Sequence, residues 1–406
     1  MRVIAAGAIV VACSAVLLAA SFERPRTFAI SAIPGLKAAD DNYTIAEPVR
    51  SDGLLRIYSL TTPYGDFSVH GDQMMRMRLV ELAVLRELEK ISGSETFSKS
   101  LVAAGLSPLK YTGRFIVNPG QTINETFTGI GSMFGRIGSS MNNPGNKQDD
   151  FMQSLLGVSD QKRKLAAKFG VDPYTDFPPL AAKLDRLSEA ATAGGLTVSG
   201  ALMFVPGAIG IVVSNLSTAN TLGDMKIEDI ARDLTAVQIL DRNRQRLAAM
   251  GAESALIETL LSNRNYTPID MAVMVAAIDS MNTVADRPAF FARAAAVESR
   301  SIAYFMRRRA EMLAVHQART RTLVRFVDLG GYPFNVARDG KVVGVMPADA
   351  VSWTDDTARA LGAATADMRR TLPGAHGELR ISGQATSLAK REIKALGWQV
   401  VENVKF

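Results

Sequence analysis

Large apolar side chains recur at intervals of three and four through much of the chain, a spacing that places them on one face of a helix. The clearest example covers residues 72–91, where Gly93 follows as an end signal. Short connections in the middle of the chain favour an antiparallel bundle. Helices are predicted over residues 72–91, 94–106, 159–170, 178–193 and, in several pieces ending with a long helix over 286–318, residues 227–318.

Residues 27–71 and the last part of the chain have a different pattern. Residues 27–71 mix short β-prone runs with Gly and Pro, which predicts strands and loops in an N-terminal arm. The last part alternates strands and helices around an Asp339-Gly340 hairpin turn. Predicted strands there cover 322–327, 334–337, 341–345, 379–381 and 399–404, and predicted helices cover 355–370 and 386–396. The predicted fold class is therefore mainly α, a helical bundle with a small C-terminal α+β module.

Two segments have unusual apolar patterns. In residues 123–141 the bulky side chains alternate in steps of four and three with several glycines between them, and residues 200–213 are almost wholly apolar. Contact of both with a membrane or a partner protein is the functional hypothesis, and burial in the protein's own core is the interpretation that helical apolar stripes more often have. The residues predicted for this contact are Phe127, Ile130, Phe134, Ile137, Phe204 and Ile209.

The N-terminus has the organisation of an export signal. Met1-Arg2 precedes an uncharged, mostly apolar run from Val3 to Ala20, and small residues at Ala19-Ala20-Ser21 offer a cleavage point. The pattern favours a removable signal peptide, with retention as a single-span anchor as the alternative. Both place the protein in the periplasm or cell envelope. The predicted divisions are 1–21 (signal or anchor), 22–141 (strand and helix region), 150–320 (helical domain) and 321–406 (C-terminal α+β module).

Two stretches carry a resemblance to a known family. They run from Lys162-Arg163-Lys164-Leu165-Ala166 to Gly170-Val171-Asp172-Pro173-Tyr174, and from Ile381-Ser382-Gly383 to Gly397-Trp398. Here the chain resembles an uncharacterised family of exported proteobacterial proteins. The resemblance implies export and an envelope role, and it supplies no catalytic residues.

Composition and motifs exclude several classes of function. A net charge of +6 is small for 406 residues and is scattered, which argues against nucleic-acid binding. The three histidines lie far apart in sequence, and the one cysteine, Cys13, lies in the export segment, so we expect no metal site and no cofactor. Two Ser-x-x-Lys matches, at Ser159 and Ser387, stand at predicted helix starts, where Ser is expected as a cap.

Polar clusters in the sequence have structural explanations. Turn chemistry accounts for Asp172 and Tyr174, and helix capping accounts for Asp355-Asp356 beside Trp353. Arg307-Arg308-Arg309, with Arg293 and Arg300 some turns earlier, is expected to form a solvated basic face, and contact with anionic lipid or an acidic partner is the alternative.

Two functional hypotheses follow from these patterns. The first is an exported, non-enzymatic envelope protein that contacts a membrane surface or another envelope protein. The second is a periplasmic hydrolase whose site is assembled from distant carboxylates and a serine, which sequence spacing alone does not reveal. Whether the chain is an enzyme, and in what oligomeric state it acts, is left open by the sequence.

Overall fold

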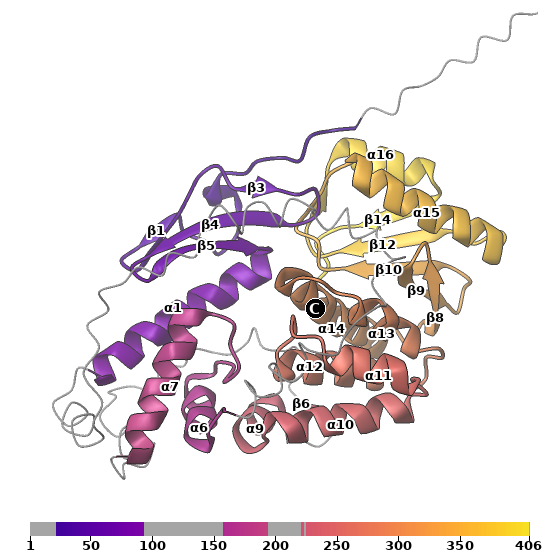
Figure 1. Cartoon of the computed structure of the whole chain (residues 1–406). Helices are drawn as coiled ribbons and strands as arrows, with labels where there is room; N and C mark the ends of the chain where they lie inside the picture. Colours follow the sequence, from indigo (N-terminus) through magenta and orange to yellow (C-terminus); the bar gives the residue numbers. More distant parts are fainter. Residues whose placement is uncertain (1–21, 93–156, 194–220, 223–224, 406) are drawn as a thin grey trace, which may run out of the picture.

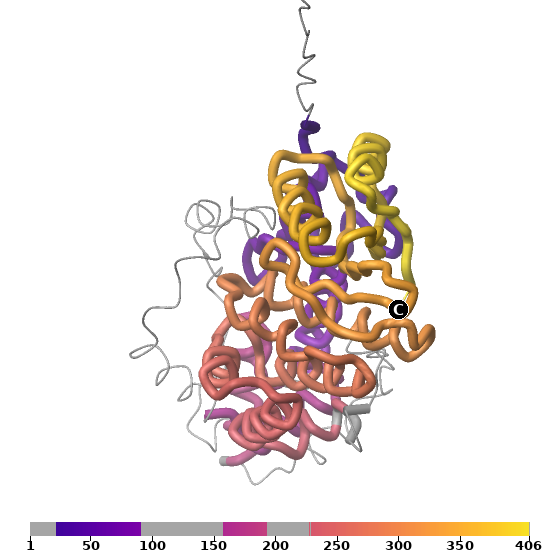
Figure 2. Tube along the Cα trace, turned by 90° about the vertical axis from the view of Figure 1, so that its right-hand side faces the viewer, coloured from indigo at the N-terminus to yellow at the C-terminus, as the bar shows by residue number. Residues whose placement is uncertain are grey.

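The computed structural model describes residues 22–92, 157–193, 221–222 and 225–405. Along the chain an antiparallel sheet and a long helix come first, a group of helices follows, and a second sheet covered by two helices comes last (Figure 1). Figure 2 shows the same order from the side, with the first and last parts of the chain together at one end and the middle helices at the other.

The N-terminal sheet is built around its longest strand, which alternates buried and exposed residues as expected for a sheet with one face packed. All its pairings are antiparallel. The helix that follows it buries Met75, Leu82, Leu85 and Leu88, at the spacing of three and four expected for a core-facing side, and leaves Leu79 partly buried. The elements are β1 (Ala39–Asp40), β2 (Tyr43–Ile45), β3 (Arg50–Ser51), β4 (Arg56–Thr62), β5 (Gly65–His70) and α1 (Asp72–Ser92), with a short 3-10 turn, η1 (Ile30–Ala32), before them.

The middle of the chain folds into helices with side-chain caps at several N-termini. Thr267 caps α12 with Asp270 as its reciprocal partner and Pro268 at the first position. Almost every residue of α12 is buried, so this helix is the centre of the group. The elements are α6 (Asp160–Phe169), α7 (Pro178–Ala193), β6 (Thr221–Leu222), β7 (Met225–Lys226), α9 (Ile227–Asp233), α10 (Ala236–Ala249), α11 (Ser254–Leu261), α12 (Pro268–Asp279), α13 (Pro288–Ala295) and α14 (Arg300–Thr320).

The C-terminal module is a mixed five-stranded sheet in the order β14-β12-β10-β9-β8. Its first three strands are parallel and are joined through helices, whereas β8 and β9 add as antiparallel hairpins. The Asp339-Gly340 turn between β9 and β10 lies where the sequence predicts it. The elements are β8 (Leu323–Leu329), β9 (Tyr332–Ala337), β10 (Val342–Met346), β11 (Ala350–Val351), α15 (Asp355–Thr371), β12 (Gly377–Ile381), β13 (Gln384–Ala385), α16 (Ser387–Ala395) and β14 (Trp398–Val401).

The prediction of a mainly α bundle is wrong, because the fold is a mixture of α and β structure. Residues 39–70 form a complete antiparallel sheet with its own core against α1, α6 and α7, where the sequence suggested an arm. The second sheet is not a small appendage either. One continuous core runs from α10–α14 into β8–β14. Short strands separated by turns gave little periodic signal, and this is why helices dominated the prediction.

The predicted long helix over 286–318 is also wrong. The structure divides it into α13 and α14, with Ala296 ending the first and Ser299 capping the second by accepting a hydrogen bond from Ile302 N at 3.4 Å. The break changes the direction of the chain, so that α13 packs on β8 and β9 while α14 runs beside α12. Ser299 was the available signal, since Ser is a preferred N-cap residue.

Gly377 begins β12 against the indole of Trp398, and a Cβ there would stand 2.0 Å from the ring. We expect Gly377→Ala to lower the free energy of unfolding by about 1–3 kcal/mol through overpacking. Gly362, within α15, has no neighbour within 4 Å of an added Cβ, so Gly362→Ala should raise stability by roughly 0.5–1 kcal/mol. Urea unfolding of the two variants measures both effects, and equal shifts would contradict the packing at Gly377.

Candidate functional site

The most concentrated group of charges lies where α1, the 172–176 loop, α12 and α14 meet, and it is mostly buried, with the side chains of Arg300 and Asp176 22% and 31% exposed. Eight side chains of alternating sign form a continuous row, called here the ion-pair series. In spatial order it consists of Glu81, Arg78, Asp176, Arg300, Asp270, Arg307, Glu311 and Arg308. Four arginines face four carboxylates, so the series is neutral when all its members are ionised.

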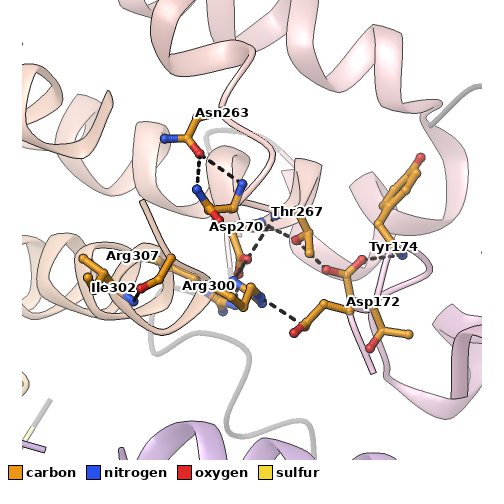
Figure 3. Close-up of polar contacts among 12 residues, drawn as sticks. Asp172, Tyr174, Asn263, Thr267, Asp270, Arg300, Ile302 and Arg307 are labelled. Carbon is orange, nitrogen blue, oxygen red and sulfur yellow. Dashed lines mark hydrogen bonds and ion pairs between the residues drawn. The ribbon is translucent and has the colours of Figure 1, made fainter. Parts of the chain in front are cut away.

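Asp270 is the centre of the series, and its position follows from the capping of α12. Its backbone N–H donates to the Thr267 hydroxyl at 3.1 Å, and its carboxylate accepts from the Thr267 N–H at 3.2 Å. The same carboxylate pairs with Arg307 at 2.9 Å and with Arg300 at 2.6 Å (Figure 3). Burial alone would raise the pKa of Asp270, but the two guanidinium groups outweigh it and hold the pKa below its ordinary value.

From Asp270 the series extends toward the N-terminal sheet. Arg300 reaches Asp176 at 3.1 Å, and Asp176 also pairs with Arg78 of α1. Burial opposes ionisation of Asp176, yet Arg78 and Arg300 on either side lower its pKa. Arg78 then pairs with Glu81 at 2.5 Å, and Thr175 donates its hydroxyl to the second oxygen of Glu81. The 172–176 loop is thereby fixed to both α1 and α14.

In the other direction the series runs along α14. Arg307 contacts Glu311 at 3.4 Å, and Arg308 pairs with the other oxygen of the same carboxylate. The expected solvated basic face is therefore wrong, since Arg307, Arg308 and Arg309 are 2%, 6% and 0% exposed. Glu311 is a local partner on the same helix, but Asp270, the second partner of Arg307, lies 37 residues away, beyond the reach of a local charge pattern.

Arg309 serves a different contact from its two neighbours. Its guanidinium donates to the carbonyl of Val345 at 2.9 Å and to the carbonyl of Pro333, and it stacks on the ring of Tyr332. Burial lowers the pKa of Arg309 to about 10. These bonds attach α14 to β9 and β10, so the consecutive arginines 307–309 join the helices on one side and the C-terminal sheet on the other.

Asp172 borders the ion-pair series without belonging to it. One carboxylate oxygen accepts from the Tyr174 N–H at 2.8 Å, which is the turn contact expected from the sequence, and the other accepts from the Thr267 hydroxyl at 2.6 Å (Figure 3). Burial, reinforced by the nearby charge of Asp270, raises the pKa of Asp172 to about 7. No guanidinium group pairs directly with Asp172 among the described ion pairs, so burial favours its neutral form.

A second polar cluster joins the N-terminal sheet to the C-terminal module. One oxygen of Asp349 accepts the backbone N–H groups of Arg56 and Asp72, each at 3.0 Å. The carboxylate of Asp72 in turn accepts from Arg56 and from the Tyr58 hydroxyl, both at 2.6 Å. Burial, and then the charge of Asp72, raise the pKa of Asp349 well above its ordinary value. This cluster works as a clamp between β4, the start of α1 and the β10–β11 loop.

The C-terminal module also encloses an apolar cavity of about 50 Å³ between its sheet and the two helices α15 and α16. Its lining is almost entirely aliphatic and aromatic, with Phe334 and Leu379 from the sheet and Leu361 and Ile393 from the helices. No carboxylate, histidine or lysine lines this cavity. The charged clusters and the cavity are therefore separate features of the molecule.

The structure places the residues singled out by sequence in different ways. The six residues predicted for membrane or partner contact, Phe127, Ile130, Phe134, Ile137, Phe204 and Ile209, lie outside the described residues. Ser159 caps α6 through Lys162 N at 3.1 Å, which confirms its structural role. Ser387 does not cap α16, because Thr386 does so by accepting from Ala389 N.

Neither a metal site nor a membrane-crossing helix is found among the described residues. No group of three or more His, Cys, Asp or Glu side chains there is arranged to hold a metal ion. Among the same residues, no helix combines the length and the apolar character that crossing a bilayer requires. Comparison of the chain with protein-family models, curated proteins and solved structures gave no match.

Arg307 offers a direct test of the ion-pair series. We expect Arg307→Met to lower the free energy of unfolding by about 3 kcal/mol or more, because it leaves buried charge on Asp270 and Glu311 less compensated. Arg244 is the matched control, since it pairs with Asp241 and Glu258 on the surface, and Arg244→Met should cost at most about 1 kcal/mol. Chemical denaturation of both variants would reject a structural role if their losses were similar.

Asp172 gives stability a pH dependence whose sign follows from its raised pKa. In the folded protein the carboxyl of Asp172 favours its protonated form. Its contribution to the free energy of unfolding is therefore fully present below the ordinary pKa near 4 and is lost as pH rises through about 7. Asp172→Asn removes the titration while keeping an acceptor for Tyr174. The stability of the variant relative to the original protein should therefore rise by about 2 kcal/mol from pH 5 to pH 8. A constant difference, measured by urea unfolding at both pH values, would contradict the raised pKa.

Proposed function

We propose that this chain is an exported, non-enzymatic protein of the cell envelope that acts in association with a membrane surface or another envelope protein. Export is supported by Met1-Arg2 followed by the apolar run from Val3 to Ala20. The resemblance to exported proteobacterial proteins supports the same address. The first 21 residues are then either a removable signal or an anchor.

The observation that carries the non-enzymatic part is the mutual neutralisation of the interior charges. Each carboxylate of the ion-pair series is held by one or two guanidinium groups, and Asp270 and Arg307 are almost fully buried. Catalytic groups need an approach for substrate and a pKa suited to proton transfer at the working pH. The series instead uses its charges to fix helices to one another, which suits a rigid binding or scaffold protein.

A periplasmic hydrolase is the competing function, and one observation favours it. Asp172 has a pKa raised to about 7, which is the range of a general base at neutral pH. Against this reading, both oxygens of its carboxylate already accept hydrogen bonds, from Tyr174 N–H and from the Thr267 hydroxyl. A base engaged in this way has to break one of these contacts before it meets a substrate proton.

Fractionation of a bacterium that expresses the full chain tests the proposal. We expect the protein in the membrane pellet after a high-salt wash, because apolar contact resists salt whereas surface ion pairs are screened. Mass spectrometry of its N-terminus identifies whether residues 1–21 are retained. A variant that lacks residues 2–20 is the control and should stay in the cytoplasm.

Release of the protein into the osmotic-shock fluid, with its N-terminus near Ser21, would contradict membrane association. A general hydrolase screen on that released protein, repeated with Asp172→Asn, would then separate the two functions. Activity lost in the variant while its fold is kept would favour the hydrolase.

A further inference from the structure

We propose that the molecule meets an anionic lipid bilayer with the end formed by residues 22–26 and α16, so that the C-terminal module is next to the membrane and α10 points away from it. This inference rests on the proposed membrane association and adds the orientation and the lipid chemistry. Four features of the described structure support it.

The first feature is the attachment of Glu23 to the C-terminal module. Its carboxylate accepts from the backbone N–H of Trp353 at 2.6 Å and from the hydroxyl of Thr386, and its own N–H donates to the Trp353 carbonyl at 3.0 Å. Thr386 is the N-cap of α16, and Trp353 directly precedes Thr354, the N-cap of α15. A carboxylate at two helix N-termini is favoured by both helix dipoles.

The consequence of this attachment is geometric. Residues 1–21 are covalently joined to a point that is fixed beside α15 and α16, more than 300 residues away in sequence. Both views show the first described residues next to α16 and far from α10 (Figures 1 and 2). If residues 1–21 are retained as an anchor, the membrane that they enter therefore lies at the α16 end of the molecule.

The second feature is the side chain at the exit point. Phe22 is 48% exposed and is the large hydrophobic residue that stands out on the surface of the described structure. Aromatic side chains next to an apolar segment are typical of the level of lipid headgroups. Phe22 follows directly after the apolar run, so its exposure is explained if the bilayer covers it.

The third feature is the charge around the exit point. Arg24 and Arg26 are exposed, and Lys394 is exposed on the outer side of α16. None of the three pairs with a carboxylate among the residues that the structure describes. Lys390 and Arg391 of the same helix do pair, with Glu402 and Glu392. Basic residues near a bilayer gain about 1 kcal/mol each from anionic lipids, and this favours phosphatidylglycerol-type headgroups as the occupant.

The fourth feature is the amphipathic character of α16. Ala389 and Ile393 are buried, whereas Lys390, Arg391 and Lys394 are exposed. This arrangement keeps the helix docked on its sheet while its basic side is presented outward. α10 is also rich in arginine, but Arg244 is neutralised by Asp241 and Glu258, and no chain exit lies beside it.

Single-cysteine variants of the full-length protein test the orientation. In a Cys13→Ala background, Ser387→Cys places a fluorophore at the start of α16, and Gln245→Cys places it on α10 as the matched control, since both positions are exposed and uncharged. The proteins are bound to vesicles of phosphatidylethanolamine and phosphatidylglycerol that carry nitroxide-labelled headgroups. We expect quenching at position 387 to exceed quenching at position 245 several-fold.

The outcomes separate this inference from the proposed function. Co-sedimentation with the vesicles together with equal quenching, or stronger quenching at position 245, would overturn the orientation and leave membrane association standing. Failure to co-sediment would overturn the orientation and the membrane part of the proposed function, which would then stand only as contact with another envelope protein. Equal binding and quenching on vesicles of neutral phosphatidylcholine would overturn the proposed preference for anionic lipid. Glu23→Ala serves as a further check, because loss of the attachment should reduce quenching at position 387 without reducing co-sedimentation.

Discussion

The fold depends on the neutral pairing of charges that it buries. Removing an ion from water costs several kcal/mol, and only close partners of opposite sign offset that cost. Asp270 is shared by Arg300 and Arg307, and Asp176 is shared by Arg78 and Arg300. No helix of the series can therefore slide without leaving a charge unpaired. The pairing therefore fixes α1, the 172–176 loop, α12 and α14 in one arrangement, which apolar packing alone enforces less strictly.

The same constraint connects the two main cores. One core joins the N-terminal sheet to α1, α6 and α7, and the other joins α10–α14 to the C-terminal sheet. The ion-pair series lies between them, and Tyr304 of α14 packs into the first core. Asp349 and Glu23 add two further connections from the N-terminal segments to the C-terminal module. A body held at three places is suited to carry a contact surface at one end, as the proposed function requires.

Local signals in the sequence predicted much of the helical structure and the C-terminal alternation. Caps such as Thr267 and turns such as Asp339-Gly340 depend on neighbours a few residues away, so they are visible in the sequence. The bond from Asp172 to Thr267 spans 95 residues, and the pair of Asp270 with Arg307 spans 37. Such partners exist only after folding, which is why the arginines 307–309 were expected at the surface. The extent of the N-terminal sheet was missed for a similar reason, since its short strands are defined by pairing with β4 or, for β1, with β2.

Equilibrium unfolding in urea, followed by two probes in one sample, tests whether the ion-pair series unites the molecule. Trp353 and Trp398 are the two tryptophans of the chain, and both belong to the C-terminal module, so their fluorescence reports that part alone. Far-UV circular dichroism is dominated by the helices elsewhere. The account predicts coincident transitions, as expected when joined parts unfold as one cooperative unit. A tryptophan transition separated from the loss of helix would show that the cores unfold independently and would contradict the central role of the buried pairing.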